Sequence, residues 1–260
     1  MIDETFVHCS GIGPKTDIRL KNLGFKNWKD CIDMQNELPF KEEKRKQFIK
    51  DLKKSRSALE ANNIALLVEK FPVKEHWRIL GEYYPEATYF DIETTGLSSY
   101  DSLITVIVCY KDNQLHTFLF QENLDDFLSL VEESSLLVAF NGNSFDIPFI
   151  ENSFNIPEIG CPYIDLRWIC YHAGYSGGLK TIEKELFVTR PEDIKSIDGF
   201  EAVSLFLDWQ NGNSLAKEKL VKYCQADVLS SYLVAIRLLD QFGICTPKLS
   251  HESVFKKLNR

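Results

Sequence analysis

Hydrophobic positions recur along this chain with two different periods. Up to about residue 80, apolar side chains mostly return every third or fourth position, a spacing that predicts amphipathic helices. We expect these helices over 14–23, from residue 28 onward, and once or twice within 41–70. After residue 88, short apolar runs bounded by turn residues predict β-strands instead. The expected strands are 88–93, 103–110, 115–120, 136–140 and 161–165.

Helical spacing also fills the segments between and after the later strands. The expected helices are 124–133, 146–154, 179–187, 200–209 and 215–242. A meander of three strands, followed by strand–helix units and C-terminal helices, predicts an α/β domain with a mixed five-stranded sheet flanked by helices. Prolines at positions 72 and 85 interrupt the pattern, so a junction is expected around 71–86. We therefore predict a small all-α domain over 1–80 and an α/β domain over 81–260.

Composition narrows the class of protein. The chain has 260 residues, enough for one large and one small hydrophobic core, and no apolar run approaches the ~18 residues that a membrane helix needs. Its first residues, Met1-Ile2-Asp3-Glu4, do not resemble a secretory signal. The seven cysteines are scattered without a Cys-x-x-Cys pair, so neither disulfides nor a zinc site is expected. The prediction is a cytoplasmic protein that does not bind membranes.

Charge is divided unevenly between the two predicted domains. The net charge is −8, yet residues 1–80 carry 16 Lys and Arg against 12 Asp and Glu, whereas residues 81–260 carry 14 against 26. A locally basic surface attracts the phosphates of nucleic acid whatever the sign of the whole chain. The acidic half instead predicts bound cations. The basic run at 41–46 is also compatible with a solvated helix face.

Two acids at the end of the first expected strand are the main candidates for catalysis. Asp91 and Glu93 lie two residues apart behind an apolar stretch, and Thr94 begins a Thr-Thr-Gly turn. Residues i and i+2 of a strand project from the same face, so the two carboxylates should point together. Burying such a pair is costly unless a cation compensates, and oxygen ligands suit Mg²⁺ or Mn²⁺. A surface strand that happens to carry two acids is the alternative.

Two further motifs place polar groups at the ends of buried elements. Asn141 and Phe145-Asp146 follow the apolar strand expected at 136–140, where a glycine-containing turn is predicted. Tyr223 and Asp227 are four positions apart in a helical segment, so they should share one face. The carboxylates of both motifs are therefore candidates for the same site as the strand pair.

The order of these motifs resembles that of the DEDD 3′–5′ exonucleases of the ribonuclease H-like superfamily, in their tyrosine subclass. In that subclass Asp-x-Glu is followed by Asn-x-x-x-Phe-Asp and then by Tyr-x-x-x-Asp, as happens here from Asp91, Asn141 and Tyr223. The resemblance implies a ribonuclease H-like fold and hydrolysis of phosphodiester bonds at the 3′ ends of single-stranded DNA or RNA. It implies two divalent cations, Mg²⁺ or Mn²⁺, with Tyr223 orienting the attacking water. The implied metal ligands are Asp91, Glu93, Asp146 and Asp227.

A closer resemblance is to the YprB-type ribonuclease H-like family, over about residues 5–240. It rests on Gly178–Leu186 (GLKTIEKEL), Asp198–Val203 (DGFEAV) and Tyr223–Val228 (YCQADV). Cys224-Gln225 departs from the family pattern, in which more polar residues are expected. Neither of these side chains is expected to face the metals, so the departure leaves the implied activity in place.

The N-terminal third contains a segment that resembles a helix-hairpin-helix element, which also occurs in that family. Gly11, Ile12 and Gly13 form a turn motif ahead of an expected helix, and Pro14 suits the first helical position. In such elements hairpin amides and a helix N-terminus hold a backbone phosphate. Gly11 and Gly13 are therefore candidates for nucleic-acid contact, while the same turn also joins helices for purely structural reasons.

Several other residues are candidates for substrate contact in the catalytic half. They are Thr94, Asn141, Phe145 and Lys180, with Arg190 a further basic residue that could meet phosphates. Alternatives remain open: Asn141 could cap a turn, Phe145 could pack beneath the site, and Tyr223 could be a core aromatic. Asp165 and Asp198 are expected to be turn or cap residues.

Two other functions fit the same fold, a structure-selective endonuclease and a nucleic-acid-binding module with an inactive site. Asp-x-Glu on the first strand argues against the endonuclease, because those enzymes usually place the second acid on a helix. The presence of all four carboxylates and the tyrosine argues against an inactive module. The sequence makes no prediction of oligomeric state.

Overall fold

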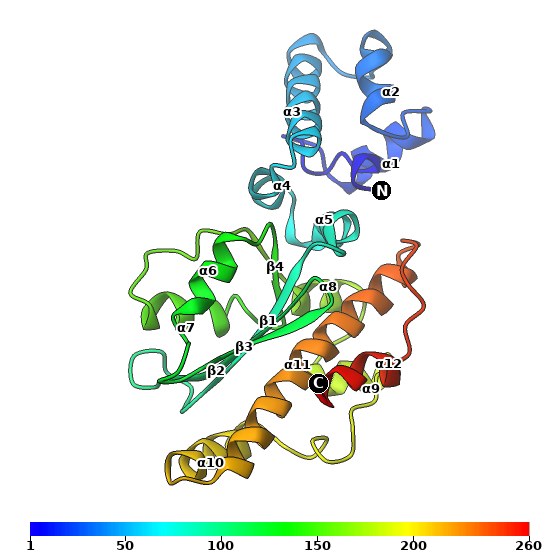
Figure 1. The fold of residues 1–260 in the computed structure, drawn as a ribbon. Helices are drawn as coiled ribbons and strands as arrows, with labels where there is room; N and C mark the ends of the chain where they lie inside the picture. Colours follow the sequence, from blue (N-terminus) through cyan, green and yellow to red (C-terminus); the bar gives the residue numbers. More distant parts are fainter. Residues whose placement is uncertain (260) are drawn as a thin grey trace. The chain divides into compact units, whose positions relative to one another are not determined.

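The computed structural model describes residues 1–259. The chain forms two compact units, Met1–Tyr84 and a second that begins at Pro85. Figure 1 shows the first unit as an assembly of helices and the second as a β-sheet with helices on its faces. Each unit contains its own buried apolar side chains.

The first unit is all-helical. Its core includes Phe6, Trp28, Phe48 and Leu52, each at most 2% exposed. The indole N–H of Trp28 donates to the carbonyl oxygen of Thr5 (2.8 Å), so the polar edge of this buried ring is satisfied. The elements are η1 Ile2–Glu4, α1 Pro14–Asn22, α2 Trp28–Asp33, η2 Gln35–Glu37, α3 Glu42–Glu60, α4 Ile64–Lys70, η3 Val73–Glu75 and α5 His76–Tyr83.

The helices expected in this unit are present, and one more is added. The segment expected over 41–70 is divided into α3 and α4, because Asn62 adopts a left-handed backbone (φ 52°) and the Asn63 side chain caps α4. The sequence did not predict α5, which lies within the segment expected to be a junction. Its helical spacing buries Ile79 and Leu80 on one face, which explains why the segment is ordered as a helix.

Five strands form one mixed sheet in the second unit, as predicted. In the order β3-β2-β1-β4-β5, the first three are antiparallel neighbours, whereas β4 and β5 run parallel to β1. β4 and β5 are shorter than the predicted 136–140 and 161–165, because only three residues of each pair with a neighbour. The strands are β1 Thr88–Thr94, β2 Ile104–Lys111, β3 Gln114–Leu119, β4 Leu137–Ala139 and β5 Tyr163–Asp165.

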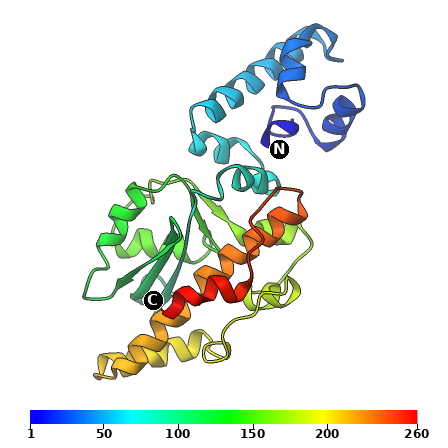
Figure 2. The ribbon, with the colours of Figure 1, turned by 45° about the vertical axis from the view of Figure 1, so that its right-hand side comes forward.

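Different helices cover the two faces of this sheet. Phe90 and Ile92 of β1 belong to a hydrophobic cluster that α6 (Asp126–Glu132) and α7 (Asp146–Ser153) complete. The long helix α11, Ser214–Gln241, packs on β1 and β2 from the other side, as Figure 1 and Figure 2 show. Because alternate strand residues point to opposite faces, β1 directs its two acids at α11.

Further helices complete the second unit. They are α8 Leu166–His172, α9 Leu179–Glu185, α10 Gly199–Gln210, α12 His251–Phe255 and the short η4 Lys256–Asn259. α9 ends before the predicted boundary at residue 187, since Phe187 adopts a left-handed backbone (φ 56°) just beyond it. Of the helices within residues 1–259, none is both long and apolar enough to cross a membrane.

Candidate active site

β1 carries Asp91 and Glu93 toward α11. The strand pairs with β2 on one side and β4 on the other, which holds its backbone in place. Its register with β2 shifts between Glu93 and Thr94, an irregularity of the kind that re-aims side chains beside active sites. At this point the hydroxyl of Thr105 donates to the Glu93 carbonyl oxygen (3.0 Å). Glu93 is only 8% exposed, and Asp91 is half-buried.

A tight turn after β4 brings Asp146 to the same region. Asn141 has a left-handed backbone (φ 67°), and its N–H donates to Asp165 Oδ1 (2.9 Å). A Cβ atom at Gly142 would lie 2.8 Å from the Cβ of Ala139, so only glycine fits at this position. The turn leads directly into α7, of which Asp146 is the first residue and is buried.

The backbone N–H groups of Asp146 itself and of Ile92 on β1 favour the ionised form of the Asp146 carboxylate and lower its pKa. Burial outweighs the stabilisation that these groups give to the ionised form and raises the pKa of Asp146 to about 7. The charges of Asp165 and Asp227 contribute to the rise. The protein alone therefore leaves this carboxylate with too little positive charge nearby.

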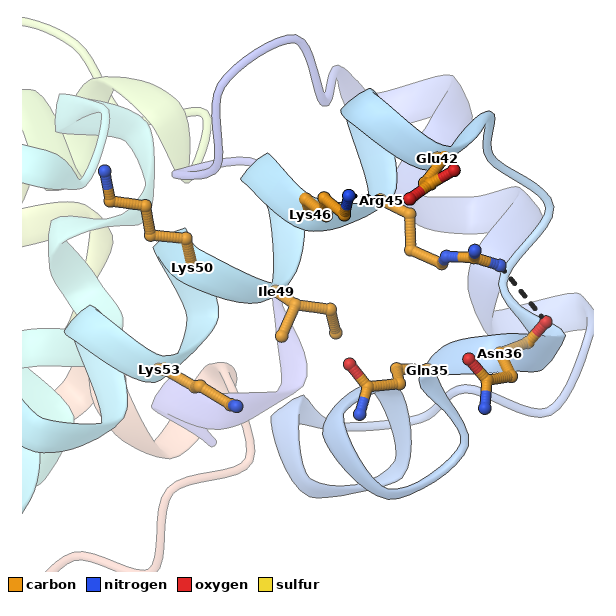
Figure 3. A pocket seen from close by; sticks show the side chains of 8 residues that line it. All are labelled: Gln35, Asn36, Glu42, Arg45, Lys46, Ile49, Lys50 and Lys53. Atoms are coloured by element: carbon orange, nitrogen blue, oxygen red, sulfur yellow. Dashed lines mark hydrogen bonds and ion pairs between the residues drawn. The ribbon is translucent and has the colours of Figure 1, made fainter.

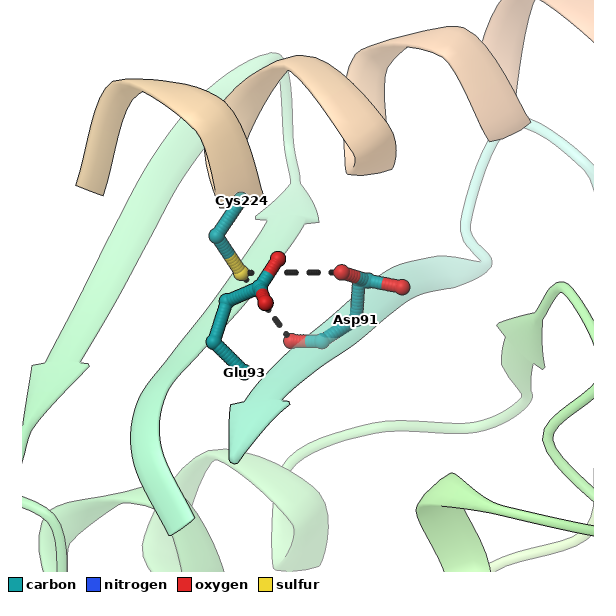
Figure 4. Close-up of side chains that lie close together, drawn as sticks. All are labelled: Asp91, Glu93 and Cys224. Atoms are coloured by element: carbon teal, nitrogen blue, oxygen red, sulfur yellow. Dashed lines mark hydrogen bonds between the residues drawn. The ribbon is translucent and has the colours of Figure 1, made fainter. Parts of the chain in front are cut away.

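α11 presents Tyr223, Cys224 and Asp227 to the two acids of β1. Cys224 Sγ lies 3.7 Å from Asp91 Oδ2 and 3.5 Å from the Asp91 carbonyl oxygen. One potential ligand atom each of Asp91, Glu93 and Cys224 lies within 4.8 Å of the others, and Figure 4 shows these side chains pointing together. The prediction that Cys224 faces away from the site is therefore wrong. Residues i and i+3 share a helix face, so Cys224 and Asp227 both lie on the side of α11 that faces β1.

The thiol of Cys224 is a hydrogen-bond donor in this setting. Burial raises its pKa well above the ordinary range, and the charge of Asp91 raises it further. A protonated thiol donates to Asp91, as the two sulfur–oxygen distances indicate. Gln225 points elsewhere, as predicted, because its amide donates to the Thr117 hydroxyl on β3 (3.2 Å).

Arg190 forms a buried ion-pair cluster with Glu183 and Asp227. Its Nε donates to both carboxylate oxygens of Glu183 (3.0 and 2.9 Å), and its Nη2 donates to Glu183 and to Asp227 Oδ1. Burial by itself would lower the pKa of Arg190, but the two carboxylates outweigh it and raise that pKa. Arg190 is 4% exposed, and its contact with a phosphate stays a prediction. One nitrogen, Nη1, has no hydrogen-bond partner within the described part of the chain.

Tyr223 lies beside two cations at the edge of this cluster. Lys180 Nζ is 5.1 Å from the centre of its ring, and the guanidinium carbon of Arg190 is 6.0 Å away. Lys180 also donates to the carbonyl oxygen of Ile197. Burial, and after it the charges of Asp227 and the β1 acids, raises the pKa of Tyr223, so its phenol is neutral. The phenol makes no hydrogen bond to any other described residue, which leaves its hydroxyl available beside the carboxylates.

The carboxylates of the site carry more negative charge than the surrounding protein balances. Burial is the main reason why the pKa values of Asp91 and Glu93 lie well above their usual range, and the charges of neighbouring carboxylates raise them further. Arg190 lowers both pKa values. However, Glu183 already neutralises the single charge of Arg190, so little of it remains for the other acids.

These residues fit divalent metal ions. The donors are carboxylate oxygens, which Mg²⁺ and Mn²⁺ prefer, and cations would supply the missing positive charge. Asp91 and Glu93 are the ligands expected beside Cys224, because the thiol is held protonated. Asp227 Oδ1 accepts a hydrogen bond from Arg190, whereas Asp227 Oδ2 lies outside that ion pair.

The predicted substrate contacts each have a local role in the structure. The Thr94 hydroxyl donates to the Gly96 carbonyl oxygen (2.6 Å) and fixes the turn after β1. Asn141 Oδ1 accepts from the Arg167 guanidinium (2.6 Å). Phe145 is half-buried and packs against the hydrophobic cluster that α7 covers. Their contact with substrate, like that of Lys180, stays a prediction.

Two further acids are caps, as predicted. Asp165 caps α8 and accepts from the Arg167 N–H (3.0 Å), in addition to its bond with the turn after β4. Asp198 caps α10 and accepts from the N–H groups of Phe200 and Glu201 (both 3.0 Å). Both carboxylates therefore stabilise helix N-termini.

The two glycines predicted to contact nucleic acid lie at the start of α1 in the first unit. Gly11 is exposed with a left-handed backbone (φ 70°). Gly13 precedes α1, and its carbonyl oxygen accepts from the N–H groups of Thr16 and Asp17 (2.9 and 3.0 Å). Pro14 occupies the first helical position, as expected. Phosphate contact at Gly11 and Gly13 stays a prediction.

A family model described as the RNase_H superfamily matches residues 88–239. The matched segment begins with β1 and ends within α11, so it contains all five of the candidate catalytic residues. The chain belongs to the RNase_H superfamily. The predicted ribonuclease H-like fold is thereby confirmed. No curated protein matches this superfamily member in sequence.

Several solved structures are similar to it at low identity. A family B DNA polymerase from the hyperthermophilic archaeon Pyrobaculum calidifontis is 16% identical, with a TM-score of 0.49, over 61% of this chain and 25% of the polymerase. A nuclease solved in its apo form is 19% identical, with a TM-score of 0.43, over 69% of this chain and 82% of that one. NrnC of Brucella melitensis with bound Mg²⁺ is 19% identical, with a TM-score of 0.35, over 66% of this chain and 94% of that one.

The sequence did not single out Glu183 or the orientation of Cys224. A signal for Glu183 exists, because Leu179, Ile182, Glu183 and Leu186 follow the helical spacing of a buried face. Ile182 and Leu186 are indeed buried, and Glu183 is buried with them. An acid at a position reserved for an apolar residue predicts a buried cationic partner, and Arg190 is that partner.

Proposed function

We propose that this chain is a two-metal-ion 3′–5′ exonuclease of the DEDD type, in the tyrosine subclass and close to the YprB-type family. Its substrate would be single-stranded DNA or RNA with a free 3′ end. The observation that carries the proposal is that acids from β1, α7 and α11 converge on one site. The negative charge of that site is not fully balanced by nearby cationic side chains. Membership of the RNase_H superfamily supports a nuclease with this arrangement.

The residues of the site would have distinct roles. Asp91, Glu93, Asp146 and Asp227 would hold two divalent cations, Mg²⁺ or Mn²⁺. Those cations would offset the charge that develops on the reacting phosphate and activate water. Tyr223 would orient the attacking water through its neutral hydroxyl, which has no partner among the described residues.

Substrate would be held at two places in the chain. Thr94, Asn141, Phe145 and Lys180 are the proposed contacts near the 3′ end. In the first unit, the turn at Gly11 and Gly13 would contact backbone phosphates as a helix-hairpin-helix element, independently of sequence. The first unit is accordingly proposed as a binding domain and the second as the catalytic domain.

The proposal is tested with linear and circular substrates of the same sequence. We expect the full chain to shorten a 5′-labelled single strand stepwise from its 3′ end, with Mg²⁺ or Mn²⁺, and to leave a covalently closed circle intact. A circle offers no end, so only an endonuclease cuts it. Cleavage of the circle as fast as the linear strand would favour a structure-selective endonuclease. Binding without cleavage of either substrate would favour a catalytically silent module.

Tyr223→Phe is expected to reduce kcat by about 10²–10⁴-fold, the range for losing one positioned catalytic group. The ring remains under Lys180 and Arg190, so KM and the melting temperature should change little. Steady-state kinetics on a labelled single strand measure the effect. Tyr171→Phe, at an exposed position on α8, is the matched control. Wild-type kcat in the Tyr223→Phe variant would make Tyr223 a core aromatic only.

A further inference from the structure

Helix α3 of the first unit carries an uneven distribution of charge. Its 19 residues contain seven Lys or Arg and four Asp or Glu. Two of the acids have other partners than the lysines of this helix. Asp51 accepts a hydrogen bond from the Ser10 N–H (2.9 Å), and Glu60 forms an ion pair with Arg56 (2.8 Å). By contrast, no anionic partner of Lys50, Lys53 or Lys54 is present in the described part of the chain. Unpaired cations are therefore concentrated in the middle of this helix.

Two hollows follow the side of α3 on which these cations lie. The first, of about 520 Å³, lies between α3 and η2, and Figure 3 shows Arg45, Ile49 and Lys53 of α3 on the side toward Gln35 and Asn36. The second, of about 430 Å³, lies between α3 and the start of α4. Lys53 lines both, so the two hollows are neighbours along α3, and together they are called the basic groove. The bases that line this basic groove are Arg45, Lys46, Lys50, Lys53 and Lys54.

Other groups in the basic groove suit a phosphate chain. Glu42 is the one acid among its described lining residues, and it is paired with Lys46 (2.6 Å). Amide and hydroxyl side chains, including Asn36 and Ser57, add neutral hydrogen-bonding groups to the lining. Charged donors with neutral hydrogen-bonding groups are the groups that proteins use for phosphate and sugar contacts.

The length of the groove indicates an extended polyanion rather than a small anion. The lining residues of α3 run from position 42 to position 58, which is about 24 Å at 1.5 Å per residue. The five bases between positions 45 and 54 cover about 14 Å, a length that several consecutive phosphates of a strand occupy and a single small anion does not. A row of charges with this extent matches a nucleic-acid backbone.

We propose that the basic groove is a second nucleic-acid-binding site, which holds the phosphate backbone of a single strand without reading its sequence. None of its lining residues belongs to the Gly11–Gly13 turn or to the carboxylate cluster of the second unit. The choice of a nucleic acid as the polyanion rests on the proposed function. Because the site is linked to the catalytic unit by the chain itself, it raises the local concentration of substrate there.

The test measures binding by the full chain in EDTA, where no metal-dependent hydrolysis occurs. A labelled oligothymidylate of about 20 nucleotides is titrated by fluorescence anisotropy between about 50 and 200 mM salt. In Lys50→Gln/Lys53→Gln/Lys54→Gln, log K should depend on log salt less steeply by about 2, since each lost single-strand phosphate contact removes about 0.7. Over this salt range, wild-type affinity should therefore fall about 20-fold more than that of the variant.

Two matched variants show whether position or total charge matters. Lys26→Gln/Lys29→Gln/Arg56→Gln removes the same charge from exposed positions of the same unit outside the groove, and it should keep the wild-type slope. Lys50→Arg/Lys53→Arg/Lys54→Arg keeps the charge and should bind like wild type. The proposal would be overturned if log K depended equally steeply on log salt in the groove variant and in the control variant with glutamines outside the groove. Tighter binding of a labelled oligoglutamate than of the oligothymidylate would also overturn it, because that result would indicate an acidic protein partner.

Hydrolysis is measured separately, with wild-type protein and Mg²⁺. If wild type binds through the groove but cleaves nothing, the exonuclease proposal fails and the proposed binding site in the groove is retained. If wild type cleaves strands but the groove variant binds like the control variant, the proposed binding site fails and the exonuclease proposal is retained.

Discussion

Asp91→Asn is expected to abolish hydrolysis and, at the same time, to stabilise the metal-free protein. Burial and neighbouring acids raise the pKa of Asp91, so ionised Asp91 opposes folding at neutral pH when no cation is bound. Because the amide cannot ionise, the variant should be relieved of this repulsion. Each 1 kcal/mol of relief would raise Tm by about 2–4 °C for a unit of this size. Turnover should fall at least about 10⁴-fold, since several kcal/mol of charge stabilisation in the transition state would be lost.

The response to metal separates this explanation from a general effect on folding. Wild type should gain about 2.7 kcal/mol from a cation at a hundred times its Kd, which is about 5–11 °C in Tm, and the gain should shrink in Asp91→Asn. Asp240→Asn, at an exposed position on α11, should keep the full gain. Thermal melts with and without Mg²⁺ or Mn²⁺ measure both quantities. An undiminished rise in Asp91→Asn would place the stabilising cation at another site.

Arg190→Gln is expected to have the largest effect on stability of any single substitution in the second unit that leaves the hydrophobic core intact. The change leaves Glu183 and Asp227 buried without their cation. Removing one partner of a buried ion pair typically costs about 3–5 kcal/mol, because the remaining charge is neither solvated nor paired. Arg190→Lys should be intermediate, since an ammonium keeps the charge but cannot reproduce the forked bonds to Glu183. Urea unfolding in EDTA, analysed for midpoint and slope, measures the difference.

An exposed pair provides the control for this effect. Lys195 forms a solvent-exposed ion pair with Glu192 (3.0 Å), and such pairs contribute about 0–1 kcal/mol. Lys195→Gln should therefore leave the urea midpoint nearly unchanged. If Arg190→Gln unfolded at the same midpoint as Lys195→Gln, the buried cluster would have no net structural role.

The sheet was predictable because the sequence patterns that mark its strands are local. Alternation around Asp91 and Glu93 gave the direction of both side chains, and the apolar run before Asn141 marked the next strand of the core. The order of the motifs along the chain then indicated a shared site. Each of these inferences needs only the period of an element and the residues at its ends.

The features that were missed depend on contacts between distant segments. The helical period places Tyr223, Cys224 and Asp227 near one another on α11, but whether Cys224 contacts β1 depends on the rotation of the helix, which packing sets. The pairing of Arg190 with Glu183 and Asp227 joins a loop to two helices, which no local pattern encodes. α5 was missed because prolines on both sides obscured a short amphipathic segment.

The position of α11 near the C-terminal end has a consequence for synthesis of the chain. β1 emerges from the ribosome long before α11, and α11 provides both Asp227 and the cover for the acidic face of the sheet. A chain that stops before residue 214 contains Asp91, Glu93 and Asp146 but lacks the helix that completes the site. If the proposed function holds, a partly made chain has no complete nuclease centre, because that centre forms only when the sheet and α11 come together.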